Sequence, residues 1–402
     1  MGKPQTAHRF LDRLAWALAL LYGLDRLLKL LAVRVFFRRP PPSEPDAWPS
    51  VSLICPITRS PNDLRRALGA RARLDYPGPQ RCLLICDAAD ASSQAICREL
   101  MAAFPTWQAE LLLVAADAGA IASKVAKQCA ALPRADGDVL CFVDDDVLLR
   151  PDALRVLVPY AVGQGVGAAF GLACYTAWGS LAESLMSGFV NTSALLSYVP
   201  LAFMVEPFTI TGHCFAMPRA RFEAVGGLGG MAGRIDDDHE LARRVRRHGL
   251  RNVQTPLVYD VENRLATLAD YHNQLRRWML IPRQTMLPSL GVREQGAMLI
   301  GSVGSLLPPL LALLALAGRR PAALAALGLS VGSFAAAYAL IERSYLRRPM
   351  PARRWPLLPL LACATPVHVA LAALGDETTH WRGQRLRIER GGRYTVLNED
   401  SR

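Results

Sequence analysis

Lysine is scarce in this sequence, and its cysteines are not closely paired. Only Lys3, Lys29, Lys124 and Lys127 are lysines among 46 basic residues, so arginine carries nearly all of the positive charge. The nine cysteines include no C-x-x-C pair, which excludes the usual ligand spacing of a structural zinc site. Their odd number and scattered positions are typical of free thiols in a reducing compartment, not of a disulfide framework. No small-residue cleavage site follows the first apolar run, so we expect no cleavable signal peptide.

The composition is strongly apolar and basic. Hydrophobic residues make up 51% of the 402 residues, and the formal net charge is +12. Such a charge suits polyanionic partners, namely nucleic acid, an anionic membrane surface or a phosphorylated substrate. The sequence contains no recognisable nucleic-acid-reading motif, and its long apolar segments favour a membrane and phosphate instead. We therefore expect no nucleic-acid partner.

An apolar stretch at residues 11–37 is long enough to span a bilayer. Three charged side chains interrupt it, so a tilted span and an interfacial helix both fit the pattern. Arg38 and Arg39 follow, before a proline-rich linker, and the positive-inside rule then places the downstream domain in the cytoplasm. We therefore predict an N-terminal membrane helix within residues 1–40.

The C-terminal part, residues 295–375, has further apolar segments. Two of them, 297–318 and 321–341, each have about the length that a bilayer requires. The third, 355–375, has arginine-rich sequence on both sides, and both flanks cannot be cytoplasmic if it crosses the membrane once. We predict two spans plus an in-plane or re-entrant segment, followed by a basic cytoplasmic tail at 376–402.

Between residues 50 and 285, short apolar strands alternate with helical stretches. This alternation predicts a mostly parallel, doubly wound α/β sheet. The predicted strands are 51–57, 80–90, 109–117 and 137–147, and the predicted helices between them are 62–74, 92–104 and 121–132.

Two of these strands end in carboxylates. Asp87 lies near the end of one strand and Asp144 near the end of another, and the carboxyl ends of parallel strands line the same edge of a sheet. Asp144 is followed by Asp145 and Asp146. An acidic turn that caps the next helix would explain this triple acid, and so would a divalent-metal site.

A second acidic cluster, Asp236–Asp238, precedes a helical pattern with basic later turns. Aspartate is favoured at helix N-caps and in first turns, so capping alone is one interpretation. Three such residues exceed what capping needs. A carboxylate of this cluster would suit the role of general base if it faced the same crevice as Asp144.

Gln274, Arg277 and Trp278 fall on one face of a predicted helix. A guanidinium with a neighbouring amide suits phosphate oxygens, and an indole can pack against a sugar ring or an acyl chain. The alternative is a membrane-interface helix, in which Trp and Arg are common anchors.

Taken in order, these motifs resemble the ceramide-glucosyltransferase-like family of inverting glycosyltransferases with the GT-A fold, which includes the bacterial hopanoid glycosyltransferases. The resemblance runs from about Val51 to Trp278 and extends to the membrane layout and the tail "HWRGQRLRI". It implies a Rossmann-like, mostly parallel α/β catalytic domain at 50–285 with flanking transmembrane helices. It also implies a multi-pass protein of the bacterial inner membrane with a cytoplasmic catalytic domain.

The resemblance implies a role for each motif residue. Asp90 matches the acid of the first motif, with Asp87 beside it, and Asp144 and Asp145 would contact the nucleotide sugar. Lys124 falls where the family has a lysine near the donor. The histidine that ceramide glucosyltransferases have between the second and third motifs has no match in "SGFVNTSALLSYV".

The remaining roles concern the metal, the base and the acceptor. By the same resemblance, Asp144 and Asp146 would bind Mg²⁺ or Mn²⁺, and Asp238 takes the place of the catalytic base. The acceptor and diphosphate side is assigned to the other motif residues, Asp237, Gln274, Arg277 and Trp278.

The expected function is transfer of a sugar from a nucleotide sugar, a UDP-sugar in the first instance, to a lipid hydroxyl such as that of ceramide or a hopanoid. Inversion of an α-linked donor would give a β-glycoside. A processive polysaccharide synthase is the alternative within the same class, since such enzymes share the Q-x-x-R-W motif but need a channel for the polymer. A non-catalytic, cation-binding membrane protein is the alternative from a different class.

Overall fold

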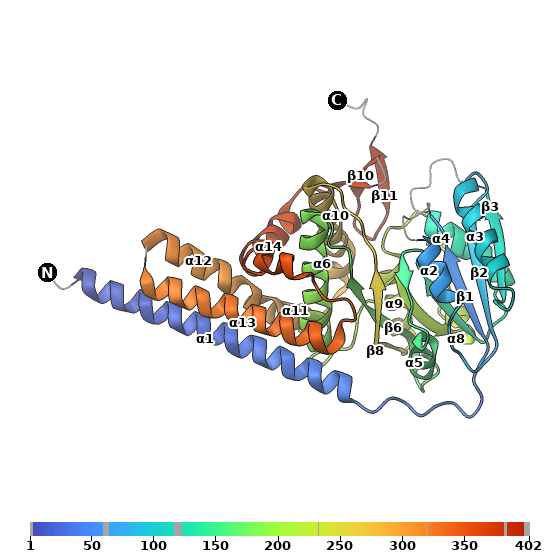
Figure 1. Cartoon of the computed structure of the whole chain (residues 1–402), viewed down its shortest axis with the longest axis horizontal. Coiled ribbons are helices and arrows are strands. Elements are labelled where there is room, and N and C mark those ends of the chain that lie inside the picture. Colours follow the sequence, from blue (N-terminus) through green and yellow to red (C-terminus); the bar gives the residue numbers. More distant parts are fainter. Residues whose placement is uncertain are drawn as a thin grey trace.

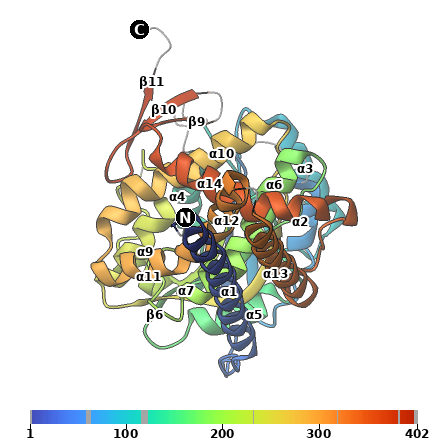
Figure 2. The same cartoon turned by 90° about the vertical axis from the view of Figure 1, so that its left-hand side faces the viewer.

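The computed structural model describes residues 3–58, 64–115, 123–231, 233–318, 320–381 and 384–397. An α/β domain, a group of long apolar helices and a small C-terminal sheet make up this part of the chain (Figure 1). The helices extend away from the α/β domain, and the N-terminus lies at their far end (Figures 1 and 2). The expected α/β class with flanking apolar helices is confirmed.

The main sheet has eight strands in the order β3-β2-β1-β4-β7-β6-β8-β5. Strands β1 to β4 are mutually parallel, β6 is parallel to β8, and the antiparallel strands are β7, between β4 and β6, and β5 at the edge. The strands are β1 Val51–Pro56, β2 Gln80–Asp87, β3 Ala109–Val114, β4 Val139–Val143, β5 Val147–Leu148, β6 Val166–Tyr175, β7 Cys214–Pro218 and β8 Arg251–Val261.

The strands read as continuous apolar runs because helices cover both faces of the sheet. Every residue of β1, β4 and β6 is buried. The predicted strands and helices of the first hundred residues of the domain are observed, although the predicted helix starts at 62 and 121 lie outside the described residues. The helices of the domain are α2 Leu64–Arg71, α3 Ala91–Ala103, α4 Ser123–Ala131, α5 Ala153–Ala161, α6 Leu181–Ser193, α7 Val199–Leu201, α8 Arg219–Ala224, α9 Asp237–Arg247 and α10 Leu268–Ile281.

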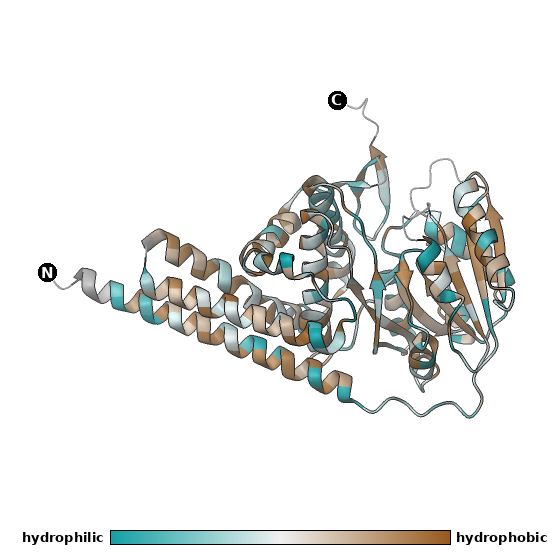
Figure 3. Cartoon of the chain, in the orientation of Figure 1, coloured by the Kyte–Doolittle hydropathy of each residue, from teal (hydrophilic) through white to brown (hydrophobic). Residues whose placement is uncertain are grey.

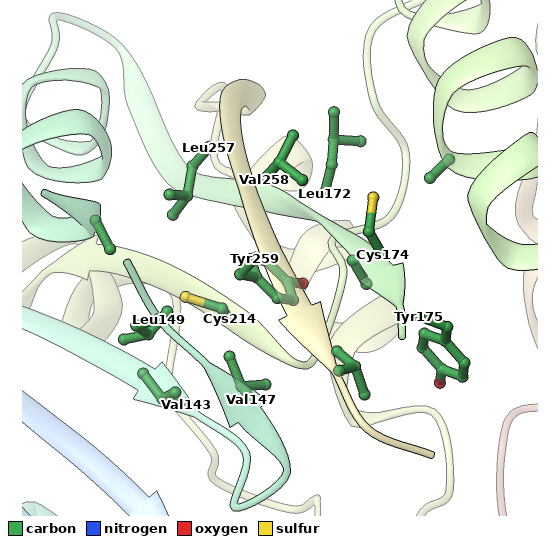
Figure 4. Packing of buried hydrophobic residues seen from close by; sticks show 14 of the residues in the cluster. Val143, Val147, Leu149, Leu172, Cys174, Tyr175, Cys214, Leu257, Val258 and Tyr259 are labelled. Carbon is green, nitrogen blue, oxygen red and sulfur yellow. The ribbon is translucent and has the colours of Figure 1, made fainter. Parts of the chain in front are cut away.

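Apolar side chains pack tightly where β4, β5, β7 and β8 meet. Val143, Val147 and Cys214 surround Tyr259 of β8, and all four residues are buried (Figure 4). This core lies directly beneath the turn that holds the first acidic cluster, because Val143 and Val147 flank that turn in sequence. The turn therefore rests on a rigid base.

Three stretches of the described chain are long and apolar enough to cross a membrane by length and composition, namely Val292–Ala317, Pro321–Tyr345 and Ala352–Leu374. Apolar residues dominate these helices and much of α1 (Figure 3). The helices are α1 Lys3–Arg38, α11 Val292–Val303, α12 Leu307–Gly318, α13 Pro321–Tyr345 and α14 Leu358–Leu374. Helices α1, α12 and α13 pack against one another.

Three charged residues in the middle of α1, Asp25, Arg26 and Lys29, face the helix bundle and not its surface. Lys29 donates to the carbonyl oxygen of Gly301 at 2.7 Å, and its ammonium lies 3.1 Å from a carboxylate oxygen of Asp25. Buried charges of opposite sign that also satisfy a backbone carbonyl are tolerated in an apolar bundle.

Both flanks of α14 contact the α/β domain. Before the helix, Arg348 pairs with Asp260 at 3.1 Å and Arg354 donates to the carbonyl oxygen of Trp178 at 3.1 Å. After it, Arg283 donates to the carbonyl oxygen of Gly375 at 2.6 Å. A helix that begins and ends on the same side is what an in-plane or re-entrant segment requires, and that assignment stays a prediction.

The tail that follows α14 folds into a three-stranded antiparallel sheet in the order β11-β10-β9. Leu386 and Ile388 are buried and pack with Leu280 of α10 and Ile235 next to the second acidic cluster. The sequence analysis described this segment only as a basic tail. Its strands are β9 Thr378–Trp381, β10 Gln384–Ile388 and β11 Tyr394–Leu397.

Candidate active site

The first acidic cluster forms the turn between β4 and β5. The backbone N–H of Asp144 donates to the carbonyl oxygen of His213 at 2.9 Å. On the other side of the turn, the guanidinium of Arg71 donates to the carbonyl oxygen of Asp144, and Arg71 is only 1% exposed. Because its backbone is held from two sides, the turn presents its carboxylates in fixed directions.

The three carboxylates of this turn have different partners. One oxygen of Asp144 lies 2.7 Å from the Lys124 ammonium. Asp145 accepts from the backbone N–H of Thr58, which follows β1, at 2.8 Å. Oδ1 of Asp146 is buried and has no hydrogen-bond partner among the described residues. An unpartnered buried carboxylate oxygen is costly, so this atom is a candidate ligand for a cation.

The second acidic cluster lies at the start of α9. Asp236 pairs with Arg234 through two contacts of 2.9 and 3.0 Å. Asp237 and Asp238 occupy the first turn of α9. Asp238 packs closely under the backbone of Gly212, where a Cβ would come within 3.0 Å of its carboxylate.

Lys124 joins the two clusters. Besides its ion pair with Asp144, its ammonium donates to the carbonyl oxygen of Gly212 at 3.0 Å, over Asp238. Burial lowers the pKa of Lys124, but the carboxylates of Asp144, Asp237 and Asp238 outweigh burial and raise the pKa above its usual range. The structure therefore brings together carboxylates from two distant parts of the chain around one cation.

Burial strongly affects the ionisation of these carboxyl groups. Burial and the charge of Asp237 raise the pKa of Asp238 to about 7. Burial and the neighbouring carboxylates also raise the pKa values of Asp145 and Asp146 to about 7. Groups that titrate near neutral pH in one crevice are typical of catalytic and metal-binding sites.

The first motif lies at the same edge of the sheet. Asp87 pairs with Lys127 at 2.7 Å, and Lys127 also donates to the carbonyl oxygen of Ile57, one residue before Thr58. Asp90 accepts from Ser92 and Ser93 and forms the N-cap of α3. The hydrogen bonds of Asp90 are thus those of a helix cap, which is the role that aspartate most often has at this position.

The last motif forms a wall of the site on α10. The guanidinium of Arg277 lies 5.1 Å from the ring centroid of Trp381 in β9. The rings of Trp278 and Tyr175 meet edge to face at 6.0 Å. Arg277 is close enough to affect the pKa values of Tyr175 and His213, while Gln274 lies half-buried one turn earlier on α10.

Several residues of this site were not predicted from the sequence. His213 lies half-buried between Asp144 and Tyr175, its buried Nδ1 has no hydrogen-bond partner among the described residues, and desolvation lowers its pKa. In the sequence, the only signal for His213 is its position between Gly212 and a buried strand. Lys127 could have been predicted as a site residue more readily, because it is one of only four lysines and lies one helical turn after Lys124.

The residues present fit a hard divalent cation. Within the described ranges, no three His, Cys, Asp or Glu side chains are arranged to hold a metal ion on their own. Mg²⁺, however, is usually held by one or two carboxylates together with substrate phosphates and water. Asp144, now paired with Lys124, and Asp146, with its orphaned oxygen, supply such a pair of oxygen donors.

Comparison with known proteins identifies the family. The glycosyl transferase family 21 profile matches residues 14–394, nearly the whole chain. The chain belongs to glycosyl transferase family 21. The resemblance found in the motifs is thereby confirmed.

Individual relatives cover less of the family 21 chain. It is 32% identical over 134 residues to an N-acetylglucosaminyltransferase of Mesorhizobium japonicum, which is 33% of this chain and 30% of the relative. It is 31% identical over 125 residues to an N-acetylglucosaminyltransferase of Bradyrhizobium elkanii, which is 31% of this chain and 65% of the relative. The matches thus span about a third to two thirds of the length of these curated relatives.

Among solved structures, a mannosyltransferase of Pyrobaculum calidifontis in complex with GDP-Man and Mn²⁺ is similar to the family 21 chain. The TM-score is 0.51 at 20% identity, over 90% of this chain and 99% of the neighbour. This likeness confirms the GT-A fold expected from the sequence.

Proposed function

We propose that this protein is a membrane-bound, inverting glycosyltransferase that moves a sugar from a UDP-sugar to a lipid hydroxyl such as that of ceramide or a hopanoid. The convergence of two acidic clusters on Lys124 is the main support. The crevice has carboxylates for a cation and a base on one side. On the other, it has α10, which packs against the apolar helix α14.

The donor is assigned to the edge of the sheet. Asp87, Asp90 and Asp145 lie at the ends of neighbouring parallel strands, where nucleotides bind in open α/β sheets. Lys124 and Arg277 place positive charge near Asp144, where the diphosphate would leave. Positive charge there stabilises the negative charge that develops on the leaving group.

Asp144 and Asp146 would hold Mg²⁺ or Mn²⁺. When bound, the cation neutralises charge on the diphosphate. The similar mannosyltransferase, in complex with GDP-Man and Mn²⁺, supports this assignment. The buried Oδ1 of Asp146, which has no partner among the described residues, is the local observation in its favour.

Asp238 is assigned as the general base. It would accept the proton of the acceptor hydroxyl while the hydroxyl oxygen bonds to the anomeric carbon and the bond to the diphosphate breaks. A raised pKa near 7 matches this task, because a base works best when its pKa lies near the working pH. Asp237 raises that pKa further through its charge and is assigned as the acidic neighbour.

The acceptor would enter from the membrane. Tyr271 and His272 of α10 contact His368 of α14, so the helix that carries Gln274 and Trp278 is directly joined to the apolar region. Tyr198 lies near Asp238 and is 54% exposed. On this side of the crevice, aromatic rings could pack against a lipid whose hydroxyl group would then lie close to Asp238.

We also propose a multi-pass location in the bacterial inner membrane, with the catalytic domain in the cytoplasm. Arg38 and Arg39 at the end of α1, and the basic loop before α14, support this orientation.

The test is a transfer assay with purified protein in detergent and Mn²⁺. UDP-glucose and UDP-N-acetylglucosamine are each supplied with ceramide, with a hopanoid or without lipid, and products are analysed by mass spectrometry. We expect one sugar per lipid molecule, and loss of product by at least about a hundredfold in Asp144→Ala. Asp136→Ala, at an exposed aspartate far from the crevice, serves as the matched control.

Other products would overturn the proposal in different ways. A polymer of repeating sugars would favour a processive synthase. UDP-N-acetylglucosamine is included as a donor because the curated relatives are N-acetylglucosaminyltransferases. Equal activity of the Asp144→Ala and wild-type proteins would remove the first cluster from the reaction.

A further inference from the structure

A groove of about 760 Å³ lies outside the candidate active site, between α9, the segment after α10 and the β10–β11 turn. Its walls contain five arginines, Arg243, Arg246, Arg247, Arg251 and Arg390, and one carboxylate, Glu206. None of the motif aspartates lines it. The groove is therefore a separate, strongly basic feature of the surface.

The positive charge of the groove is only partly neutralised. Arg243 pairs with Glu240 at 2.9 Å, and Arg246 pairs with Glu294. Glu240 is shared with Arg234 and Arg244, so it compensates only part of the charge of Arg243. Even when Glu240 and Glu294 are counted with Glu206, five arginines face three carboxylates.

Two arginines at the groove are available to a ligand. Arg247 and Arg390 are exposed, and neither has an acidic partner within 4 Å among the described residues. They come from distant parts of the chain, since Arg247 ends α9 and Arg390 lies in the β10–β11 turn. Guanidinium groups that line one groove are suited to bind phosphate oxygens.

The groove lies where the chain enters the apolar region. Pro288 and Ser289 line it, and α11 begins three residues later at Val292. Val292 is 89% exposed, and Leu299 and Ile300 further along α11 are about two thirds exposed. Because Val292 also begins a candidate membrane span, the membrane location proposed above puts the groove at the level of the lipid headgroups.

The lining argues against a nucleotide as the ligand. No aromatic side chain lines the groove, and its apolar side chains, Leu250 and Pro288, are aliphatic. Proteins that hold a base usually stack it on an aromatic ring. A phosphate without a base, carried on a membrane lipid, fits both the charge and the position.

We infer that the arginine groove binds the headgroup of an anionic phospholipid, as a second lipid site apart from the acceptor. A bound headgroup would join α9, the end of α10 and the C-terminal sheet. Ser289 in the groove is hydrogen-bonded to His239, the residue after Asp238, at 3.1 Å. Gly391 in the groove is followed by Gly392, whose carbonyl oxygen accepts from the N–H of Ile235. Headgroup binding therefore holds the elements that carry the second acidic cluster.

The experiment measures binding directly and does not depend on transfer activity. Full-length protein in a neutral detergent is titrated by calorimetry with short-chain phosphatidylglycerol, short-chain phosphatidylcholine, inorganic phosphate and UMP. We expect saturable binding of phosphatidylglycerol, at least about tenfold tighter than phosphatidylcholine, because only the former carries net negative charge. Arg247→Gln/Arg390→Gln should weaken it at least about tenfold.

Matched variants make the result decisive. Arg98→Gln/Arg134→Gln removes the same charge from the far edge of the domain and should bind like wild type. Arg247→Lys/Arg390→Lys should recover part of the binding, and the melting temperature of each variant shows that it is folded. Unchanged phosphatidylglycerol binding in Arg247→Gln/Arg390→Gln would overturn the site. Equal or tighter binding of inorganic phosphate or UMP at these arginines would overturn the assignment to a lipid.

Discussion

The two triple-aspartate segments are identical in sequence but differ in structure. Residues 144–146 form a turn after a buried strand, whereas residues 236–238 begin a helix. In each segment one carboxylate is fixed by the fold, Asp145 by the N–H of Thr58 and Asp236 by Arg234. Among the other carboxylates, those of Asp144, Asp237 and Asp238 lie near Lys124. In both segments, therefore, one of the three consecutive carboxylates is held by a contact within the fold, and at least one other lies near Lys124.

The difference between the segments suggests different chemistry. The first turn is held from behind by Arg71 and leaves an oxygen of Asp146 without a partner among the described residues, which suits a ligand for a cation. In the second, Asp238 is packed under Gly212 at a helix N-terminus. A helix dipole favours the ionised carboxylate, but burial acts more strongly and brings the pKa near neutrality. A group that changes protonation near neutral pH suits a base.

The sharpest test of this comparison is to neutralise one aspartate in each segment. Asp238→Asn should lower the transfer rate by about 10²–10⁴-fold, because the general base is lost, and should leave binding of the nucleotide sugar nearly unchanged. Asp144→Asn should lose donor binding and transfer together, because it removes a ligand of the cation. Rates are measured by product formation, and donor binding is measured by calorimetry with the UDP-sugar in the presence of Mn²⁺.

The two outcomes are distinguishable from a general loss of structure. Melting temperatures of both variants should stay close to that of the wild type, because each change is nearly isosteric and Lys124 keeps the carbonyl oxygen of Gly212 and the remaining carboxylates nearby. If Asp238→Asn lost donor binding to the same degree as Asp144→Asn, the division of roles between the segments would be wrong.

The sequence predicted the parts of this comparison that depend on local patterns. Apolar runs followed by acids placed Asp87 and Asp144 at strand ends, and strands β1 to β4 are observed where they were predicted. Their convergence at one edge follows from parallel pairing, which a βαβα order predicts. The second cluster was expected at a helix start and is found there.

Residues that enter the site through long-range packing were not predicted. Arg71 lies in an ordinary amphipathic helix pattern, and only the packing of α2 against the β4–β5 turn brings its guanidinium to the carbonyl of Asp144. His213 reaches the site because β7 runs antiparallel to β4, a reversal that the strand pattern did not indicate. The C-terminal sheet was missed for a similar reason, since its strands are short and their apolar positions contact α10, far away in sequence.

A second test follows the protonation of Asp238. Its pKa, about 7 compared with an ordinary value of 3.8, predicts that the transfer rate rises with pH through about 7 and falls about tenfold per pH unit below it, because only the ionised carboxylate accepts a proton. Asp237→Asn removes a negative charge that raises this pKa, so the midpoint should move to lower pH. Rate–pH profiles at saturating donor measure both. An acid limb that keeps its midpoint in Asp237→Asn would belong to another group.

The smallest expected effect concerns the structural member of the second segment. Asp236 is 1% exposed and forms a two-contact ion pair with Arg234. Asp236→Asn leaves Arg234 without its main partner, so the free energy of unfolding should fall by about 3 kcal/mol, the lower end for a buried pair because Arg234 also contacts Glu240. In a domain of this size that corresponds to a melting temperature lower by roughly 6–12 °C.

Transfer activity well below the transition should change little, and the exposed Asp136→Asn should change neither quantity. Loss of transfer without a lower melting temperature would mean that Asp236 takes part in the chemistry, and its assignment to a purely structural role would then be wrong.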